Sequence, residues 1–163
     1  MVGVLPSAFV LGLAAVGALA VTLARPSPAE LREERSAASG ALAVAVVFQG
    51  VHFVEEAWTQ LPTRLGTLLG LPSMSFRFFL AFNVAWLGIW IASVPGLRAR
   101  RRPAFFAAWF MVIAGIFNGL AHPLMALASW AYFPGLITSP LLGLVAVRLL
   151  LSLGRATRPR QGE

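Results

Sequence analysis

Two histidines and two adjacent glutamates are the residues of this chain best suited to chemistry. His52, Glu55 and Glu56 lie close together in one long apolar stretch, and His122 lies in another. Glu55 and Glu56 are the only acids expected inside such a stretch. A charge at the centre of a membrane costs about 2.5–3.5 kcal/mol on insertion scales. Packing alone does not explain two neighbouring carboxylates there, and they require protons, a metal ion, cationic partners or water.

In a helix these residues share one face. Successive residues are about 100° apart, so Glu55 lies about 60° to one side of His52 and Glu56 about 40° to the other. Gln49 and Thr59 fall on the same arc. The stretch therefore predicts a helix face with an imidazole, two carboxylates and two neutral polar groups.

His122 is expected on a second helix, together with other polar and small residues. Asn118 precedes His122 by four residues and so shares its face. Pro123 follows at once and leaves the carbonyl one turn earlier without its helical donor. Gly115 and Gly119 have the spacing of small residues that lets two helices approach closely.

The composition indicates that helices spanning a membrane position these groups. The chain of 163 residues is 58% hydrophobic and 12% charged, whereas a soluble domain has about 25% charged residues. Its 13 basic residues are all arginines, and most lie at the edges of apolar stretches, where they set topology and contact lipid phosphates. The net charge of +7 therefore does not indicate nucleic-acid binding. The absence of cysteine excludes disulfides and thiolate chemistry.

Five apolar stretches are each long enough for about 20 helical residues across a hydrocarbon layer of about 30 Å. We therefore expect an all-α fold, a bundle of five transmembrane helices in a single domain of residues 1–153. The first stretch lacks the positive start of a signal peptide, so a retained helix is expected. The predicted spans are residues 4–23, 37–61, 76–97, 103–129 and 134–153.

The segments between the predicted spans are polar, aromatic or broken by proline and glycine. Residues 25–36 predict a short surface helix. Residues 61–75 contain two prolines and two glycines and predict an interfacial or re-entrant connector. Residues 130–133 predict an aromatic turn, and residues 154–163 predict a basic cytoplasmic tail.

The arginines predict the orientation of the bundle. With five spans, ten arginines fall on one side of the membrane and only Arg64 and Arg77 on the other. Because loops rich in arginine stay in the cytoplasm, the N-terminus is expected outside and the C-terminus in the cytoplasm.

The same topology places the polar groups at one depth. At 1.5 Å per residue, His52 and Asn118 lie about 22 Å above the cytoplasmic face, and Glu56 and His122 lie about 28 Å above it. All therefore fall in the outer half of the bilayer. Further polar residues are expected at this level, where they contact a substrate or support the other groups: Gln49, Thr59, Asn83, Tyr132 and Thr138.

Three patterns in this part of the chain carry a resemblance. They are His-x-x-Glu-Glu at 52–56, Asn-x-x-x-His at 118–122 and Tyr-x-Pro-Gly-x-x-Thr at 132–138. In this order they resemble the motifs of the HXXEE family of bacterial membrane proteins, over roughly residues 40–150. That family is defined by its motifs and has no established activity. The resemblance implies a multi-pass protein of the bacterial cytoplasmic (inner) membrane, and it supports the site without naming a reaction.

The first functional hypothesis is a metal-dependent enzyme. His52, Glu56 and His122 supply two imidazole nitrogens and one carboxylate oxygen, a ligand set of hydrolytic zinc sites and of non-haem iron sites. Glu55 is then a general base or a second ligand, and Asn118 orients a ligand or polarises a carbonyl. The predicted catalytic residues are thus Glu55, Glu56 and Asn118, and the predicted cofactor is a divalent metal, Zn or Fe. The expected reaction is a hydrolysis or an oxidoreduction of a lipid-like substrate.

Other functions stay open beside a purely structural role. In a metal-free acid–base isomerase or cyclase of a sterol- or terpene-like molecule, one glutamate keeps its proton and tryptophan rings stabilise a carbocation. A proton-coupled transporter or a non-catalytic membrane partner also uses intramembrane Glu and His. Alternating access by five short helices would require a homo-oligomer. Membrane lipids and a hydrophobic small molecule are the expected partners, and nucleic acid is not.

Overall fold

The computed structural model describes residues 5–25 and 32–158, which form an all-helical fold with no strand among them. Six helices cover these residues. Their bounds are α1 Leu5–Ala24, α2 Arg32–Trp58, α3 Leu61–Leu69, α4 Phe76–Arg98, α5 Arg102–Ser129 and α6 Ser139–Ala156. The predicted all-α class is confirmed for the part of the chain that the structure describes.

Four of these helices, α2, α4, α5 and α6, are long and apolar enough to cross a membrane, as a multi-pass membrane protein requires. The apolar stretch Val10–Ala24 of α1 is shorter than these four. The fifth span and the orientation of the termini therefore stay predictions.

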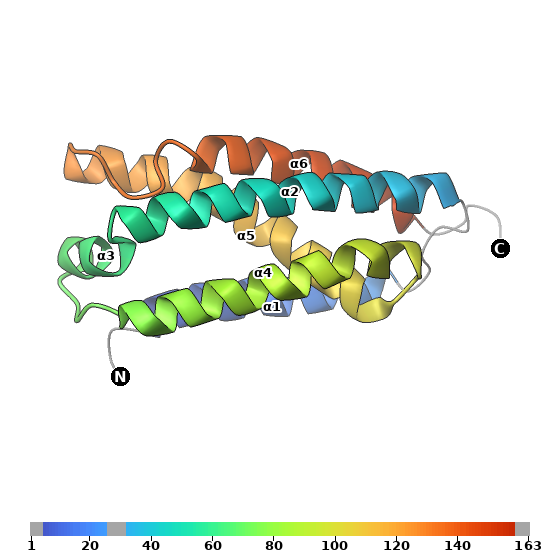
Figure 1. The fold of residues 1–163 in the computed structure, drawn as a ribbon, viewed down its shortest axis with the longest axis horizontal. Helices are drawn as coiled ribbons and strands as arrows, with labels where there is room; N and C mark the ends of the chain where they lie inside the picture. The colour runs from blue at the N-terminus through green and yellow to red at the C-terminus, as the bar shows by residue number, and fades with distance from the viewer. Residues whose placement is uncertain (1–4, 26–31, 159–163) are drawn as a thin grey trace.

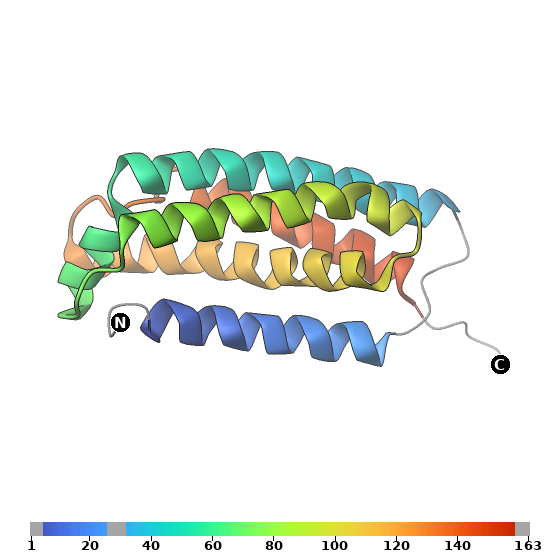
Figure 2. The ribbon, with the colours of Figure 1, turned by 60° about the horizontal axis from the view of Figure 1, so that its bottom comes forward.

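The long helices run along one axis and alternate in direction (Figures 1 and 2). The end of α2, the short helix α3 and the loop of residues 130–138 lie together at one end, which we call the α3 end. The connection between α4 and α5 and the end of α6 lie at the opposite end. We call this the arginine end, because Arg98, Arg100, Arg101, Arg102 and Arg155 lie there.

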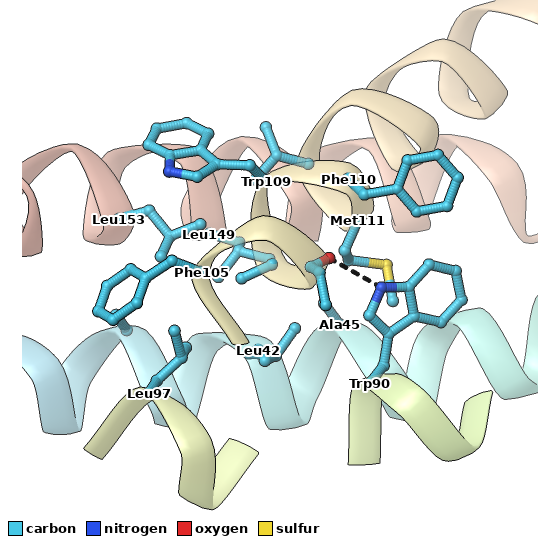
Figure 3. Close-up of a cluster of buried hydrophobic side chains, with 14 of the residues drawn as sticks. Leu42, Ala45, Trp90, Leu97, Phe105, Trp109, Phe110, Met111, Leu149 and Leu153 are labelled. Carbon is cyan, nitrogen blue, oxygen red and sulfur yellow. Dashed lines mark hydrogen bonds between the residues drawn. The ribbon is translucent and has the colours of Figure 1, made fainter. Parts of the chain in front are cut away.

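The apolar core fills the bundle between these helices (Figure 3). Leu42 from α2, Leu97 from α4, Met111 from α5 and Leu149 from α6 are all fully buried in this core. Trp90 is also buried, and its Nε1–H donates to the carbonyl oxygen of Ala107 at 2.9 Å (Figure 3). The only polar atom of this indole is therefore satisfied, and the ring packs as an apolar group.

Glycines bring α5 and α6 into close contact. A Cβ atom on Gly119 would lie 2.8 Å from Gly143 Cα, and one on Gly115 would lie 2.8 Å from Ala146 Cβ. The predicted close approach of a helix at Gly115 and Gly119 is confirmed. This contact between the two helices holds the first turn of α6 beside the C-terminal half of α5. It therefore brings residues 132–138, which precede α6, close to His122.

Two predicted helix starts are wrong. The second long helix already includes Arg32, the first residue that the structure describes after residue 25, and so extends before residue 37, where it was predicted to begin. Residues 32–36 thus belong to α2, and not to a separate surface helix; the preceding residues 26–31 lie outside the described part of the chain. The last helix begins at Ser139, not at residue 134, because Gly135 adopts a positive φ of 84° and turns the chain.

The other predicted boundaries shift for similar reasons. The second span ends at Trp58, not at residue 61, because Gln60 has a positive φ of 61° and separates α2 from α3. The connector 61–75 contains the nine-residue helix α3, which is too short to span. Helix α6 continues through residues 154–156 of the predicted tail, and residues 159–163 lie outside the described residues.

Candidate metal centre

Three buried side chains from two helices meet at the α3 end of the bundle. His52 and Glu56 are one turn apart on α2, and His122 comes from the end of α5. Their exposed fractions are 0%, 5% and 5%. One ligand atom from each lies within 4.8 Å of the others, so the three can hold a metal ion.

The Nε2 atoms of the two imidazoles lie close to the same carboxylate oxygen. The distance from Glu56 Oε1 to His52 Nε2 is 3.2 Å, and the distance to His122 Nε2 is 3.3 Å. The rings are nearly perpendicular, with centroids 4.9 Å apart. Around a tetrahedral ion with ligands at about 2.1 Å, two neighbouring ligand atoms are about 3.4 Å apart. The two measured distances from Glu56 Oε1 to the imidazole nitrogens are close to this separation between ligand atoms.

The second nitrogen of each ring is held by a defined partner. His122 Nδ1 lies 2.5 Å from the carbonyl oxygen of Pro134. A carbonyl only accepts hydrogen bonds, so Nδ1 carries a proton, and in the neutral imidazole Nε2 then keeps a lone pair. His52 Nδ1 lies 2.8 Å from Thr138 Oγ1. The Thr138 hydroxyl donates to Glu55 Oε2 at 2.5 Å, so it accepts from His52 and assigns the same tautomer to that ring.

With these tautomers, two nitrogen atoms with lone pairs lie close to one carboxylate oxygen. Lone pairs repel one another unless a proton or a metal ion lies between them. His52 Nε2 is fully buried and has no hydrogen-bond partner among the described residues, although Glu56 lies close enough for an ion pair. The oxygen therefore lies away from the direction in which this nitrogen donates or accepts. A metal ion placed between the atoms satisfies both nitrogens, so the donor set fits a metal.

Glu55 has a different environment from its neighbour Glu56. Its carboxylate accepts hydrogen bonds from the Tyr132 hydroxyl at 2.6 Å, the backbone N–H of Ile137 at 3.1 Å and the backbone N–H of Thr138 at 2.9 Å. The Thr138 hydroxyl is the fourth donor. A carboxylate has about four lone-pair positions, and all are in use here. This arrangement positions the loop before α6; the predicted role of Glu55 as a general base or second metal ligand stays a prediction.

Tyr132 lies at the outer rim of this network. Burial, together with the hydrogen bond and the charge of Glu55, raises the pKa of the Tyr132 hydroxyl above its ordinary value of about 10. The hydroxyl therefore keeps its proton at neutral pH and remains a donor to Glu55.

Gly135 lets the loop lie against both imidazoles. Its φ of 84° is in the region that L-residues with a side chain rarely adopt. A Cβ atom here would lie 2.6 Å from His122 Nδ1 and 2.7 Å from His52 Cε1. The motif 132–138 contains Gly135 and Pro134, but sequence reasoning assigned neither a role at the site. The Pro-Gly pair after the aromatic turn was the available signal.

The remaining predicted site residues lie outside the three-residue cluster. Thr59 and Asn83 donate to carbonyls of their own helices, those of Glu55 and Phe79. Gln49 is buried one turn before His52, and Asn118 is half-buried one turn before His122. Neither amide forms a hydrogen bond with the cluster in the part of the chain that the structure describes.

No protein-family model, curated protein or solved structure matches this chain.

Proposed function

We propose that this chain is a membrane metalloenzyme that acts on a lipid-like substrate, with its metal held by His52, Glu56 and His122. One observation carries the proposal. Both imidazoles use Nδ1 for a protein hydrogen bond and place Nε2 within 3.3 Å of Glu56 Oε1, and His52 Nε2 has no hydrogen-bond partner among the described residues. Metal-binding histidines are usually fixed in this way by a hydrogen bond from the other ring nitrogen.

The ligand set favours zinc or iron. Two imidazoles and one carboxylate bind Zn²⁺ in hydrolytic enzymes and Fe²⁺ in oxygenases, and both kinds of site leave a coordination position open. Bound there, the metal supplies a Lewis acid and lowers the pKa of a coordinated water. The choice between a hydrolase and an oxidoreductase is left to experiment.

The chain's own residues provide orientation and charge. Glu56 offsets one of the two positive charges of a divalent ion, and the two histidines remain neutral donors. Thr138 and the carbonyl of Pro134 hold the rings. Glu55, saturated by four donors, fixes the loop that carries Thr138. In this proposal Glu55 is a positioning residue.

The surroundings of the cluster support a hydrophobic substrate. The cluster lies on helices α2 and α5, which are long and apolar enough to cross a membrane. Side chains adjacent to it in sequence are apolar and point outward: Val51 and Val54 are 53% and 62% exposed, and Leu120 and Leu124 are 64% and 62% exposed. A substrate that reaches this part of the molecule from the bilayer is itself lipid-soluble. The resemblance to the HXXEE family agrees with such a protein of the bacterial cytoplasmic membrane.

The metal-free acid–base alternative fits the geometry less well. It requires a glutamate that keeps its proton, whereas the carboxylate of Glu55 accepts four hydrogen bonds and so has no lone-pair position left for a proton. It also requires aromatic faces beside the cluster. Trp90 and Trp109 are buried in the apolar core, and Trp58 and Trp130 are 86% and 92% exposed.

The proposal is tested by lipid turnover that depends on the metal. The protein is stripped with a chelator, reloaded with Zn²⁺ or Fe²⁺ (iron with O₂ and a reductant) and incubated with a bacterial lipid extract, and the lipids are compared by mass spectrometry. Glu56→Gln removes the proposed carboxylate ligand. Glu33→Gln is the matched control, since it removes an exposed acid at the other end of the same helix.

We expect the reloaded wild type and Glu33→Gln to change the same lipid species, and the stripped protein and Glu56→Gln to leave it unchanged. A reloaded protein that binds metal but converts no lipid would contradict the proposed enzymatic activity. Equal conversion by the stripped protein would support the metal-free alternative instead.

A further inference from the structure

A groove with two arginines opens between α2 and α6, far from the His/Glu cluster. Its volume is about 510 Å³. The α2 wall is made of small residues, among them Ala37 and Gly40, and the α6 wall carries Leu144 and Leu151 together with Arg148 and Arg155. The groove is therefore apolar along its length and positively charged on one wall.

Arg148 is the unusual residue of this wall. It is exposed on a helix that is long and apolar enough to cross a membrane, eight residues before the helix ends at Ala156. Eight residues correspond to about 12 Å of helix. Arg148 forms no ion pair or hydrogen bond with the described residues. A cation at this depth needs a compensating anion or a path to the interface, because apolar surroundings do not solvate it.

Arg155 and Ser152 extend the polar wall toward the arginine end. Residues four and seven positions apart share a helix face, so Arg148, Ser152 and Arg155 form one row along the groove. Among the residues that the structure describes, no acidic one lines the groove. Two cations beside a hydroxyl group match the oxygens of a phosphate, to which guanidinium groups donate in pairs.

We propose that this groove binds an anionic phospholipid. The phosphate lies between Arg148 and Arg155, and an acyl chain lies along the small residues of α2. Charge complementarity selects this occupant, since the groove offers cations to the headgroup and an apolar floor to the chain. Basic pockets between transmembrane helices commonly bind such headgroups at the cytoplasmic side. The site is independent of the metal centre.

The test measures the relative association of spin-labelled phosphatidylglycerol and phosphatidylcholine with the reconstituted full chain. Arg148→Gln and Arg155→Gln each remove a cation from the groove. Arg158→Gln is the charge control, because it removes an exposed arginine at the same end that does not line the groove. We expect each groove variant to lower the preference for phosphatidylglycerol about fivefold, or about 1 kcal/mol, and the control to lower it less than twofold.

A second pair of variants tests whether the acyl chain lies along the small residues of α2. Gly40 lines the groove and a Cβ atom on it meets nothing within 4 Å, so Gly40→Leu adds an apolar side chain at the groove wall. Gly88→Leu on α4 is the matched control, since that position is equally open and does not line the groove. We expect Gly40→Leu to reduce phosphatidylglycerol association and Gly88→Leu to leave it unchanged. Equal losses in all arginine variants, or no effect of Gly40→Leu, would overturn the proposal and indicate only diffuse attraction.

Discussion

The two ends of this bundle handle their polar groups in opposite ways. At the α3 end, His52, Glu56 and His122 are buried, and a loop whose hydroxyl, carbonyl and N–H groups have defined partners folds over them. At the arginine end, charges such as Arg98 and Arg155 are exposed, and Arg35 is the buried charge. The buried hydroxyls of Ser39 and Thr157 there donate singly to backbone carbonyls and form no cluster of ionisable groups. The first end is organised by directional contacts and the second by packing.

This difference separates a chemical role from a stabilising one. Burial of polar groups is unfavourable unless each has a partner, so burying three ionisable side chains together costs more at the α3 end than burying Arg35 costs at the arginine end. Substitutions at the α3 end should therefore change metal binding first. Substitutions in the apolar core should change stability and leave metal binding intact.

The largest effect is expected for Gly135→Ala. The positive φ costs about 1–2 kcal/mol with a side chain, and the contact with the two imidazoles adds about 1–3 kcal/mol of overpacking. We expect an unfolding free energy lower by about 2–5 kcal/mol, measured in detergent, and metal affinity lower by about 100-fold, since the ring positions are lost.

Gly70→Ala is the control for Gly135→Ala. Gly70 also has a positive φ, of 64°, but a Cβ atom there meets nothing within 4 Å. We expect the unfolding free energy of Gly70→Ala to fall only by the cost of the positive φ, about 1–2 kcal/mol, and its metal affinity to stay unchanged. If both variants behaved alike, the loop would not be packed on the imidazoles as described.

Leu42→Ala tests the same comparison with a substitution in the apolar core instead of the α3 end. Leu42 is fully buried in the apolar core, so its truncation leaves a cavity. We expect the unfolding free energy to fall by roughly 2–3 kcal/mol with no change in metal affinity, measured by denaturant unfolding and by metal titration. A parallel loss of metal affinity would show that the two ends are not separate.

Thr138→Val removes the hydroxyl between Glu55 and His52 while keeping the shape of the side chain. His52 then loses the partner that fixes its tautomer. We expect a loss of metal affinity of about 10- to 100-fold, as for other groups that orient metal ligands. Thr138→Ser keeps the hydroxyl and should retain most of the affinity; a loss as large as that of the valine variant would argue against the hydrogen bond.

Tyr132→Phe is expected to have the smallest effect. It removes one of four donors to Glu55 at a half-exposed position, which costs about 1 kcal/mol or less. Because the pKa of Tyr132 is raised in the folded state, the hydroxyl's contribution is present below about pH 10 and is lost as the pH rises further. Unfolding free energies of both proteins across this range measure the difference, which should be constant below pH 10. A difference that disappears near neutral pH would contradict this.

The sequence was enough to predict the helices and the convergence of the two histidines with a glutamate. Long apolar stretches and the scarcity of acids made His52, Glu56 and His122 stand out. The predicted start of α6 was wrong because the turn at Gly135 depends on contacts with residues distant in the chain. A local pattern does not contain those contacts.

The sequence also could not predict which of Glu55 and Glu56 contacts the imidazoles and which contacts the loop. Helical geometry places them on either side of His52 at similar angles, so either carboxylate is a candidate ligand. The decisive partner of Glu55 is the loop before α6, which is more than 75 residues away along the chain. Only the folded arrangement directs one carboxylate to the loop and the other to the imidazoles.

Metal content and coordination test the central claim most directly. The full chain is purified without chelator, offered Zn²⁺ and Fe²⁺ in turn, and analysed for metal per chain and by X-ray absorption. We expect about one ion with nitrogen and oxygen ligands at about 2.0–2.2 Å in the wild type and in Glu33→Gln, and little bound metal in Glu56→Gln. A folded wild-type chain without metal, or a Glu56→Gln variant that retains it fully, would contradict a metal centre at His52, Glu56 and His122.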